Sequence, residues 1–381
     1  MLTPPLSSAA VDTAAIAARC AADAETRRQL DPDVVKAIVA AGFTRHFVPL
    51  SYDGQAGTFS ELMRAVITVG EACAATAWCA SVSASISRMA AAFLPAEGCQ
   101  EIWADGPDVI VVGSVTPLGK AEPVAGGWLL SGRWPYISAV SFSDWALVCG
   151  LVHTGREPES KLFAIPRASY SIEDTWFNIG MQGTGSNTIV AEDVLVPTRR
   201  AFNRTDLFAG RAVEFPHTIE ACYSAPLQAV NGLFFVIPAL GAARGALESF
   251  SGYIGGKIRN APTLPGVPGT QGNRTTYEMA LARSAGEIDA AQLLLERATA
   301  IADQGAAVTS LETTQNLRDC SLAMDLLVTA VNRIFRTAGT TGQSSTGPLQ
   351  RFWRDVNSIS THVAIQFEPA ARAYASALLK V

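Results

Sequence analysis

The spacing of apolar residues changes twice along the chain and divides it into three parts. In residues 1–108, apolar side chains recur at intervals of three or four positions, which predicts helices. Asp31 followed by Pro32 marks the start of a helix with an apolar stripe over Val34–Val39. Thr58–Glu61 has the pattern of a capping box that opens a longer helix. The first part is therefore predicted to be an N-terminal helical domain.

From residue 109 the pattern changes to short runs of β-branched and other apolar residues between turn signals. These runs predict strands, and Ala125–Gly127 predicts a hairpin turn between the first two. The expected strands cover residues 109–115, 127–137, 145–152, 161–165 and 188–196. Residues 109–205 are therefore predicted to form a small central antiparallel β domain.

Helical periodicity returns after a loop that is expected over residues 202–215. Residues 259–272 contain too many prolines and glycines for a helix and are expected to form an exposed excursion. Long helices are predicted over residues 220–256, 274–304, 309–338 and 348–379, the last beginning at Pro348. Residues 206–381 are thus predicted to form a C-terminal four-helix bundle, and the whole chain to have an α+β fold.

Composition excludes several classes of partner. A chain of 381 residues with 49% hydrophobic content can bury a large core. Charged residues make up only 17% of the chain and the formal net charge is −5, so no basic surface for nucleic acid or an anionic membrane is expected. The expected partners are small molecules and other protein chains.

The seven cysteines form no C-x-x-C pair and have no metal-ligand spacing with the four histidines. We therefore expect no metal site, and we expect reduced thiols in a cytoplasmic protein. The N-terminus lacks the basic start and apolar block of a signal peptide. Residues 221–243 carry no charge, but they include two prolines, a glutamine and an asparagine, which favours a buried core helix over a membrane span.

Several segments resemble motifs of the acyl-CoA dehydrogenase family. Met181–Ser186, with the strand that follows it up to Pro197, resembles the family's flavin-side loop and its exit from the β domain. Ala338–Gly342 and Pro348–Asp355 resemble its glycine turn and its arginine–aspartate helix start. The order of helices, β domain and helical bundle is also that of the family. The resemblance covers essentially the whole chain and implies the family's fold.

One branch of that superfamily matches better, namely the two-component flavin-dependent monooxygenases that include the oxygenase components of 4-hydroxyphenylacetate hydroxylase and dibenzothiophene monooxygenase. The matching pieces are Ala77–Ala80, Ser131–Trp134 running on to Ser138, Asp144–Trp145, Arg351–Asp355 and Thr361–His362. One departure is visible, because Ala139 follows Ser138 where these relatives usually have glycine.

The absent catalytic base separates the two branches. Dehydrogenases of this scaffold often carry a glutamate nine residues after the arginine of the arginine–aspartate pair, and here that position is Val363. Valine cannot accept a proton. Some members place the base on an earlier helix, so an FAD-dependent acyl-CoA dehydrogenase stays as an alternative. The neighbouring His362 matches a histidine that the monooxygenases carry into their active site.

The resemblance implies a reaction in which a separate NAD(P)H-dependent reductase supplies reduced FMN or FAD. Dioxygen then forms a flavin hydroperoxide, which hydroxylates an aromatic or polycyclic small molecule. Ser138 and His362 are the implied catalytic residues. The Ser138 hydroxyl would lie near flavin nitrogen 5 and restrain loss of peroxide, while His362 would deprotonate a phenol or hydrogen-bond the hydroperoxide.

The resemblance also implies a flavin site. Trp78, Trp134 and Tyr136 would wall its cavity. Thr184 and Ser186 would bind the polar edge of the ring, while Arg259, Ser344 and Ser345 would bind the phosphate from a neighbouring subunit of a homotetramer. The full implied set is Trp78, Cys79, Ser114, Trp134, Tyr136, Ile137, Ser138, Thr184, Ser186, Arg259, Ser344 and Ser345.

Two further readings stay open. The same scaffold supports N-oxygenation of an amine, including an amino-sugar nucleotide, although a charged nucleotide would require basic residues that do not cluster in this sequence. The chain can also be a catalytically idle binding subunit. Mixing the protein with reduced flavin and air separates an oxygenase from the dehydrogenase, and the absence of both a flavin hydroperoxide and bound flavin would indicate the idle subunit.

Overall fold

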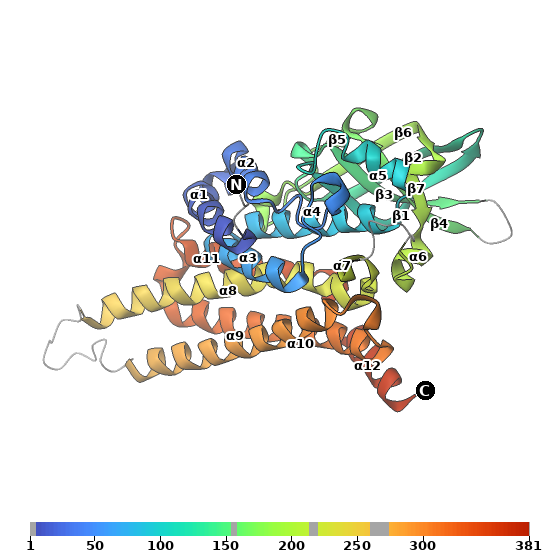
Figure 1. Cartoon of the computed structure of the whole chain (residues 1–381). Coiled ribbons are helices and arrows are strands. Elements are labelled where there is room, and N and C mark those ends of the chain that lie inside the picture. The colour runs from blue at the N-terminus through green and yellow to red at the C-terminus, as the bar shows by residue number, and fades with distance from the viewer. Residues whose placement is uncertain (1–4, 154–157, 213–219, 260–273, 381) are drawn as a thin grey trace, which may run out of the picture.

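The computed structural model describes residues 5–153, 158–212, 220–259 and 274–380. Three units pack together in it: a helical N-terminal unit, a β-sheet unit and a bundle of long helices along one side of both (Figure 1). The α+β class predicted from the sequence is confirmed.

The N-terminal unit begins its helices where the sequence predicts them. Asp31 caps α2 by accepting a hydrogen bond from Asp33 N, and Thr58 caps α3 by accepting one from Glu61 N. The helices are α1 (Leu6–Arg27), α2 (Pro32–Ala41), α3 (Phe59–Ala72), α4 (Ala74–Phe93) and α5 (Ala96–Ile102). Helix α4 packs against both α8 of the bundle and β1 of the sheet, and it is buried along nearly all of its length. It therefore places its few accessible residues at the junction of the three units.

One mixed sheet forms the second unit, with strand order β5-β6-β2-β1-β3-β4-β7. The strands are β1 (Val111–Val124), β2 (Gly127–Ile137), β3 (Trp145–Val152), β4 (Glu159–Pro166), β5 (Ser171–Glu173), β6 (Asn187–Pro197) and β7 (Ala201–Asn203). The predicted bounds of β2 and β3 are confirmed. Strand β1 runs nine residues beyond its predicted end, and β5 and β7, of three residues each, are too short to leave an apolar pattern.

The prediction of a purely antiparallel domain needs a correction, because β1 and β3 pair in parallel. Strand β2 is antiparallel to β1, so it ends, at Ile137, near the residues where β1 begins. The short segment that follows, with the 3-10 turn η2 (Val140–Phe142), leads to the other side of β1. Strand β3 then starts level with β1, with Trp145 paired to Val111, and must run in the same direction. The other neighbouring strands are antiparallel.

The third unit contains α8 (Leu227–Arg259), α9 (Arg274–Ala302), α10 (Ser310–Ala338), α11 (Pro348–Ile359) and α12 (Phe367–Leu379), preceded by the short helices α6 (Arg204–Ala209) and α7 (Ala221–Ser224). The loop predicted over 202–215 contains part of β7 and α6. Pro226 separates α7 from α8. The predicted excursion lies outside the described residues, apart from Arg259, which ends α8.

The prediction of one helix over residues 348–379 is wrong, because this segment forms two helices with a break over Ser360–Gln366. Polar side chains there take over hydrogen bonds that a helix would make with its own backbone. Thr361 Oγ1 donates to the Ser358 carbonyl, and Gln366 Nε2 donates to the carbonyls of Ser360 and His362. His362 lies inside this break and caps the 3-10 turn η10 (Val363–Ile365).

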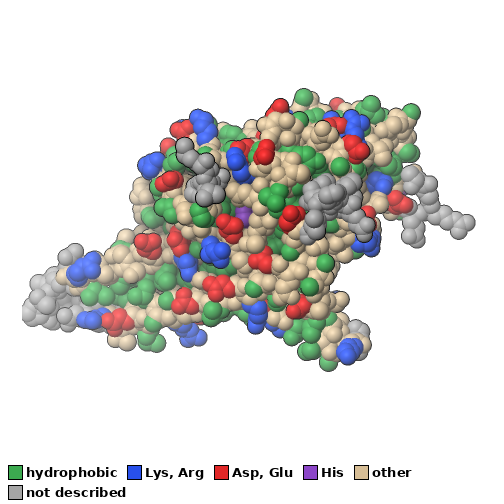
Figure 2. Space-filling view, viewed as in Figure 1, with side chains coloured by type: hydrophobic (Ala, Val, Ile, Leu, Met, Phe, Trp, Pro, Cys, Tyr) green, Lys and Arg blue, Asp and Glu red, His purple; other side chains and the backbone are tan. Residues whose placement is uncertain are grey.

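Helix α8 is long and apolar enough to cross a membrane by length and composition alone. However, 78% of its most apolar window is buried within the protein, as expected for a core helix. On the face shown in Figure 2, side chains of both charge signs are interspersed, and no large area of one sign is visible there.

Candidate active site

Three hydroxyl groups and one indole form a continuous hydrogen-bonded series where α4 meets the sheet. The Trp78 indole Nε1–H donates to Ser138 Oγ at 2.9 Å. Ser138 Oγ lies 2.8 Å from Ser186 Oγ, which lies 2.7 Å from Thr184 Oγ1. Thr184 Oγ1 donates to the Met181 carbonyl oxygen at 2.8 Å. We call this series, from Trp78 to Met181, the hydroxyl chain.

The backbone around Ser138 explains why a serine at the end of β2 reaches the loop before β6. Ala139 has a φ of 58°, so the chain turns sharply after Ser138. The Ala139 N–H then donates to the Thr184 carbonyl at 2.8 Å. Thr184 ends the 3-10 turn η4 (Gln182–Thr184), and Gly185 follows with a φ of 54°. Because glycine adopts this left-handed conformation easily, Ser186 can turn back toward Ser138.

An aromatic cluster adjoins the hydroxyl chain. Within α4, only Trp78 and Val82 are less than fully buried, and they lie one turn apart on the same face of the helix. The Trp78 ring lies 5.2 Å from the Phe235 ring of α8 and 5.8 Å from the His362 ring, between centroids. Phe235 and His362 lie 3.9 Å apart at 31°. Each of the three side chains is half-buried, so the cluster borders both the core and solvent.

His362 is held as a neutral imidazole. Its Nδ1 accepts the Ala364 N–H at 3.2 Å, which leaves the ring proton on Nε2. Burial lowers the pKa of His362 to about 4, because the surroundings disfavour the charged form. No hydrogen bond to Nε2 occurs within the described part of the chain. The imidazole therefore offers one free N–H donor beside Phe235 and Trp78.

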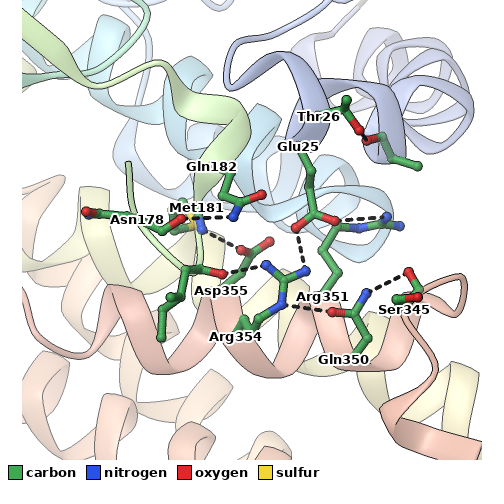
Figure 3. Close-up of polar contacts among 12 residues, drawn as sticks. Glu25, Thr26, Asn178, Met181, Gln182, Ser345, Gln350, Arg351, Arg354 and Asp355 are labelled. Carbon is green, nitrogen blue, oxygen red and sulfur yellow. Dashed lines mark hydrogen bonds and ion pairs between the residues drawn. The ribbon is translucent and has the colours of Figure 1, made fainter. Parts of the chain in front are cut away.

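The loop that supplies Met181 and Thr184 is anchored to the bundle. Asp355 of α11 accepts the Met181 N–H at 2.6 Å through Oδ1. Arg354 donates to the Ile179 carbonyl on the same loop and to Glu25 of α1 (Figure 3). Figure 3 shows the two arginine side chains of α11, Arg351 among them, extending toward Glu25. The arginine–aspartate motif thus holds the loop over residues 179–186 against two helices.

Further contacts fix the loop from the sheet side. Asn187 Oδ1 accepts the backbone N–H groups of Thr175 and Trp176 at 2.9 and 3.0 Å. The Trp176 indole donates to the Met181 carbonyl at 3.0 Å, so this carbonyl receives both Trp176 and Thr184. Arg28 binds Asp174 through two nitrogens. The loop is therefore held by contacts from α11, from the sheet side and from Arg28 at the end of α1.

Trp134 contradicts its sequence-based assignment. We expected it to wall the flavin cavity, but its side chain is 0% exposed and its indole N–H donates to the Cys149 carbonyl at 2.7 Å. The ring fills space that the neighbouring strands leave open, because a Cβ at Gly119 or Gly132 would lie within 2.7 Å of it. Trp134 is a core residue of the sheet.

Two other predicted contacts offer no side chain to a ligand. Cys79 and Ile137 are 2% and 1% exposed. The Cys79 thiol contacts the Thr184 carbonyl at 3.8 Å, and burial raises its pKa. Thr184 and Ser186 are also buried, and their hydroxyls are engaged in the hydroxyl chain. These residues would meet a flavin through backbone atoms only.

Tyr136 and Ser114 remain accessible. Tyr136 is 73% exposed, has a φ of 66° and lies beside Trp176 at 6.3 Å between ring centroids. Its unusual backbone coincides with the irregularity in β2 between Trp134 and Ile137. Ser114 is half-buried at an irregularity in β1, where its Oγ accepts the Thr116 N–H at 3.3 Å. Among the described residues, no hydrogen bond or ring contact joins either side chain to the aromatic cluster.

The predicted phosphate residues lie outside this junction. Arg259 is exposed at the end of α8, and Ser344 and Ser345 are exposed before α11. The twelve residues of α11 separate the serines from the break that carries His362, and a helix of that length spans about 18 Å. Within one chain, the two serines therefore lie well away from His362.

The sequence did not predict the roles of two residues of the site. Phe235 lies in an uninterrupted apolar stretch of α8, where no pattern separates a site residue from a core residue. Asp355 belongs to a recognised motif, but its bond to Met181 links positions that are far apart in the chain. Only the folded arrangement shows either role.

The donor set suits a flavin ring. An isoalloxazine is flat and apolar on its faces and carries hydrogen-bonding atoms along one edge, so it requires aromatic walls beside a few polar groups. The half-buried Trp78 and Phe235 rings would fit as walls, while the Ser138 hydroxyl and the free His362 N–H would fit as the polar groups. Among the described residues, no group of three histidine, cysteine, aspartate or glutamate side chains is arranged to hold a metal ion.

Comparison with known proteins supports this interpretation. Residues 233–367 match the family described as acyl-CoA dehydrogenase, C-terminal domain. The chain is 29% identical over 356 residues to the FADH(2)-dependent resorcinol hydroxylase, oxygenase component, of Rhizobium sp. (strain MTP-10005), covering 90% of this chain and 86% of that protein. It is 28% identical over 352 residues to the flavin-dependent monooxygenase oxygenase subunit HsaA of Rhodococcus jostii (strain RHA1), covering 90% of each. The crystal structure of 3-HSA hydroxylase from Rhodococcus sp. RHA1 superimposes with a TM-score of 0.92 and 26% identity, covering 100% of this chain and 98% of that one.

Proposed function

Because the chain belongs to the flavin-dependent monooxygenases of the acyl-CoA dehydrogenase fold, we propose that it is an oxygenase component that hydroxylates an aromatic or polycyclic small molecule. The observation that carries the proposal is the meeting of Ser138 and His362 on either side of Trp78. Ser138 ends a strand, while His362 occupies a break between two bundle helices. Their convergence beside aromatic walls creates one site for a flat ring.

Reduced flavin supplies the electrons that activate dioxygen, and the substrate receives one of the two oxygen atoms. The chain's own residues position the reactants and exclude water from them. Ser138 would hold the nitrogen 5 edge of the flavin through its hydroxyl oxygen. His362 would donate its Nε2–H to an oxygen atom of the reacting pair. Removal of a phenol proton would require a lone pair on Nε2, and the bond from Ala364 to Nδ1 favours the opposite tautomer.

The walls of the site favour an aromatic substrate. Trp78 and Phe235 are half-buried aromatic rings, and among the described residues no lysine or arginine makes a cation–π contact with, or hydrogen-bonds to, Trp78, Phe235 or His362. A nucleotide sugar would leave its phosphate charges without partners there. The resorcinol hydroxylase among the relatives supports a phenolic substrate.

The dehydrogenase alternative lacks its base at the usual position. Val363 is 81% exposed and points a hydrocarbon side chain away from the core. Within the described residues, no carboxylate hydrogen-bonds to or forms an ion pair with Trp78, Phe235 or His362. In the part of the chain that the structure describes, the carboxylate bonded to the flavin-side loop is Asp355, which accepts the Met181 N–H.

The expected partners follow from the same assignment. A separate NAD(P)H-dependent reductase would deliver the reduced flavin. Arg259, Ser344 and Ser345 would bind the flavin phosphate of a neighbouring subunit, which requires an oligomer, and a homotetramer is our proposal. Their exposure leaves them available for such a contact. The free cysteines among the described residues suit a reducing cytoplasm.

The decisive experiment supplies reduced FMN or FAD anaerobically and then mixes the protein with air-saturated buffer and a phenol such as resorcinol. We expect a colourless purified protein that consumes dioxygen and forms hydroxylated product only when reduced flavin is present. A yellow protein that oxidises an acyl-CoA thioester without dioxygen would establish the dehydrogenase instead. Absence of both flavin binding and hydroxylated product would establish an idle binding subunit, since free reduced flavin consumes dioxygen without any protein.

A further inference from the structure

The directions of the hydrogen bonds in the hydroxyl chain follow from its two ends. At one end stands the Trp78 indole N–H, which can only donate. At the other end stands the Met181 carbonyl oxygen, which can only accept. A contact of 2.8 Å between Thr184 Oγ1 and that carbonyl is attractive only when the threonine proton lies between the two oxygens.

The proton count then orients the interior of the chain. Each hydroxyl carries one proton, and Thr184 spends its proton on Met181. Ser186 must therefore donate to Thr184, and Ser138 must donate to Ser186. The hydroxyl chain has four hydrogen bonds, and four protons fill them: one from each of the three hydroxyls and one from the Trp78 indole. No hydroxyl proton is left over for a ligand.

Ser138 consequently presents a particular chemistry to the site. Its Oγ accepts from Trp78, donates to Ser186 and retains one lone pair. Ser138 is the only half-buried hydroxyl of the chain, since Thr184 and Ser186 are 1% and 4% exposed. A ligand atom that meets this oxygen must be a hydrogen-bond donor.

We infer that the hydroxyl chain makes the site selective for the reduced form of the flavin, with Thr184 and Ser186 as the residues that determine this selectivity. Nitrogen 5 of a flavin carries a proton in the reduced ring and only a lone pair in the oxidised ring. Ser138 can accept from the first, whereas the second would place two lone pairs against each other. The inference rests on the proposed function, because it requires the flavin ring to lie at Ser138.

The selectivity has a consequence for turnover. An oxygenase that receives its flavin from a reductase must capture the reduced form and release the oxidised form. If the site loses one hydrogen bond when the ring is oxidised, it binds the reduced flavin more tightly and releases the oxidised flavin more easily, without any conformational change. Thr184 and Ser186 act through Ser138, so they are positioning residues.

Two variants interrupt the hydroxyl chain at different hydrogen bonds. Thr184→Val keeps the shape of the side chain but removes its hydroxyl, so Ser186 can turn its proton toward Ser138, and Ser138 can turn its own toward the ligand. Ser186→Ala removes the acceptor of the Ser138 proton directly. Thr184→Ser is the matched control, because it keeps a hydroxyl at the same position.

The measurement is the ratio of the two dissociation constants, for oxidised and for reduced flavin, by anaerobic and aerobic titration. We expect the intact protein to prefer the reduced form, Thr184→Val and Ser186→Ala each to lower that preference by about five- to tenfold, and Thr184→Ser to retain it. A variant that merely loosens the fold would weaken both forms equally and leave the ratio unchanged.

The outcomes separate the inference from the function on which it rests. If Ser138→Ala changes the ratio while Thr184→Val and Ser186→Ala leave it at the intact value, the inference is wrong and the placement of the flavin stands. If Ser138→Ala also leaves the ratio unchanged, the flavin does not lie at Ser138, and both the inference and that placement are overturned; the proposed function itself fails only if the intact protein forms no hydroxylated product with reduced flavin.

Discussion

Asp355 accepts a 2.6 Å hydrogen bond from the backbone N–H of Met181, and this bond ties the bundle to the loop that carries Thr184 and Ser186. Met181 has a φ of 54°, a left-handed conformation that is unfavourable for a residue with a side chain. The buried carboxyl group compensates for it by binding the N–H. The carbonyl of the same residue ends the hydroxyl chain, so Asp355 positions the site without touching a ligand.

Asp355 should make the stability of the protein depend on pH. Burial raises its pKa to about 7, from a usual value of 3.8. Since the folded state holds the proton more tightly than the unfolded state, this stabilisation is complete below about pH 4 and is lost as pH rises through 7. Asp355→Asn keeps an oxygen acceptor for Met181 but cannot ionise. We therefore expect the variant to lose less stability than the natural protein between about pH 5 and about pH 8 in urea unfolding.

Asp355→Ala is the companion to that measurement. It leaves the Met181 N–H without a partner, and it should lower the free energy of unfolding by about 1–3 kcal/mol at either pH. If Asp355→Asn unfolds with the same pH dependence as the natural protein, another group is responsible for it.

Ser138→Ala should uncouple oxygen consumption from hydroxylation. Without the Ser138 oxygen, the nitrogen 5 edge of the flavin loses its partner, so we expect more hydrogen peroxide per product formed, by about tenfold. The ratio of peroxide to product in air-saturated buffer measures this directly. Ser143→Ala is a suitable control, since Ser143 lies in the same segment but binds Val140 and Tyr170. An unchanged ratio in Ser138→Ala would remove Ser138 from the flavin.

His362→Ala should lower the rate of product formation by about ten- to a hundredfold, the effect of one well-placed donor. Because burial lowers the pKa of His362 to about 4, the ring is neutral at both about pH 6 and about pH 8. The loss should therefore be the same at the two values. A loss that grows with pH would indicate a general base of ordinary pKa, contrary to our tautomer assignment. His153→Ala, at the exposed position that follows β3, should leave turnover unchanged.

The sequence predicted elements wherever a repeating pattern persisted. The alternation in β2 and β3 and the capping box of α3 were sufficient to locate them. The break between α11 and α12 could not be predicted, because Ser360, Thr361 and His362 are compatible with the polar face of a helix. Their preference for local backbone acceptors becomes visible only in the contacts that they make.

The sequence predicted site residues that belong to a family motif. It did not predict which of those residues are buried in the core of the folded protein and therefore have a packing role. Ser138 and His362 both contact Trp78, so three residues taken from the family motifs lie together, while their roles toward a flavin stay a prediction. Trp134 belongs to the same motif, but glycines at 119 and 132 open a space for its ring inside the sheet. Those glycines lie on β1 and β2 and face each other only after the strands pair, so the sequence order gives no sign of the space.

The close approach of the flavin-side loop to α11 gives the last prediction. A Cβ at Gly180 would lie 2.5 Å from the Arg354 carbonyl oxygen and 2.3 Å from Ser358 Oγ, and the carbonyl cannot move without disturbing the helix. Gly180→Ala should therefore push the neighbouring Met181 away from Asp355. We expect a loss of about 1–3 kcal/mol in the free energy of unfolding and weaker binding of reduced flavin.

Gly252→Ala is the control for that variant. Gly252 is exposed within α8, and a Cβ there meets no atom within 4 Å, so alanine should stabilise the helix by about 0.5–1 kcal/mol and leave flavin binding unchanged. Thermal unfolding and anaerobic flavin titration of both variants test the difference. Normal flavin affinity in Gly180→Ala would mean that the loop reaches its position without the contact to α11, and that the Asp355–Met181 bond is not needed to place the hydroxyl chain.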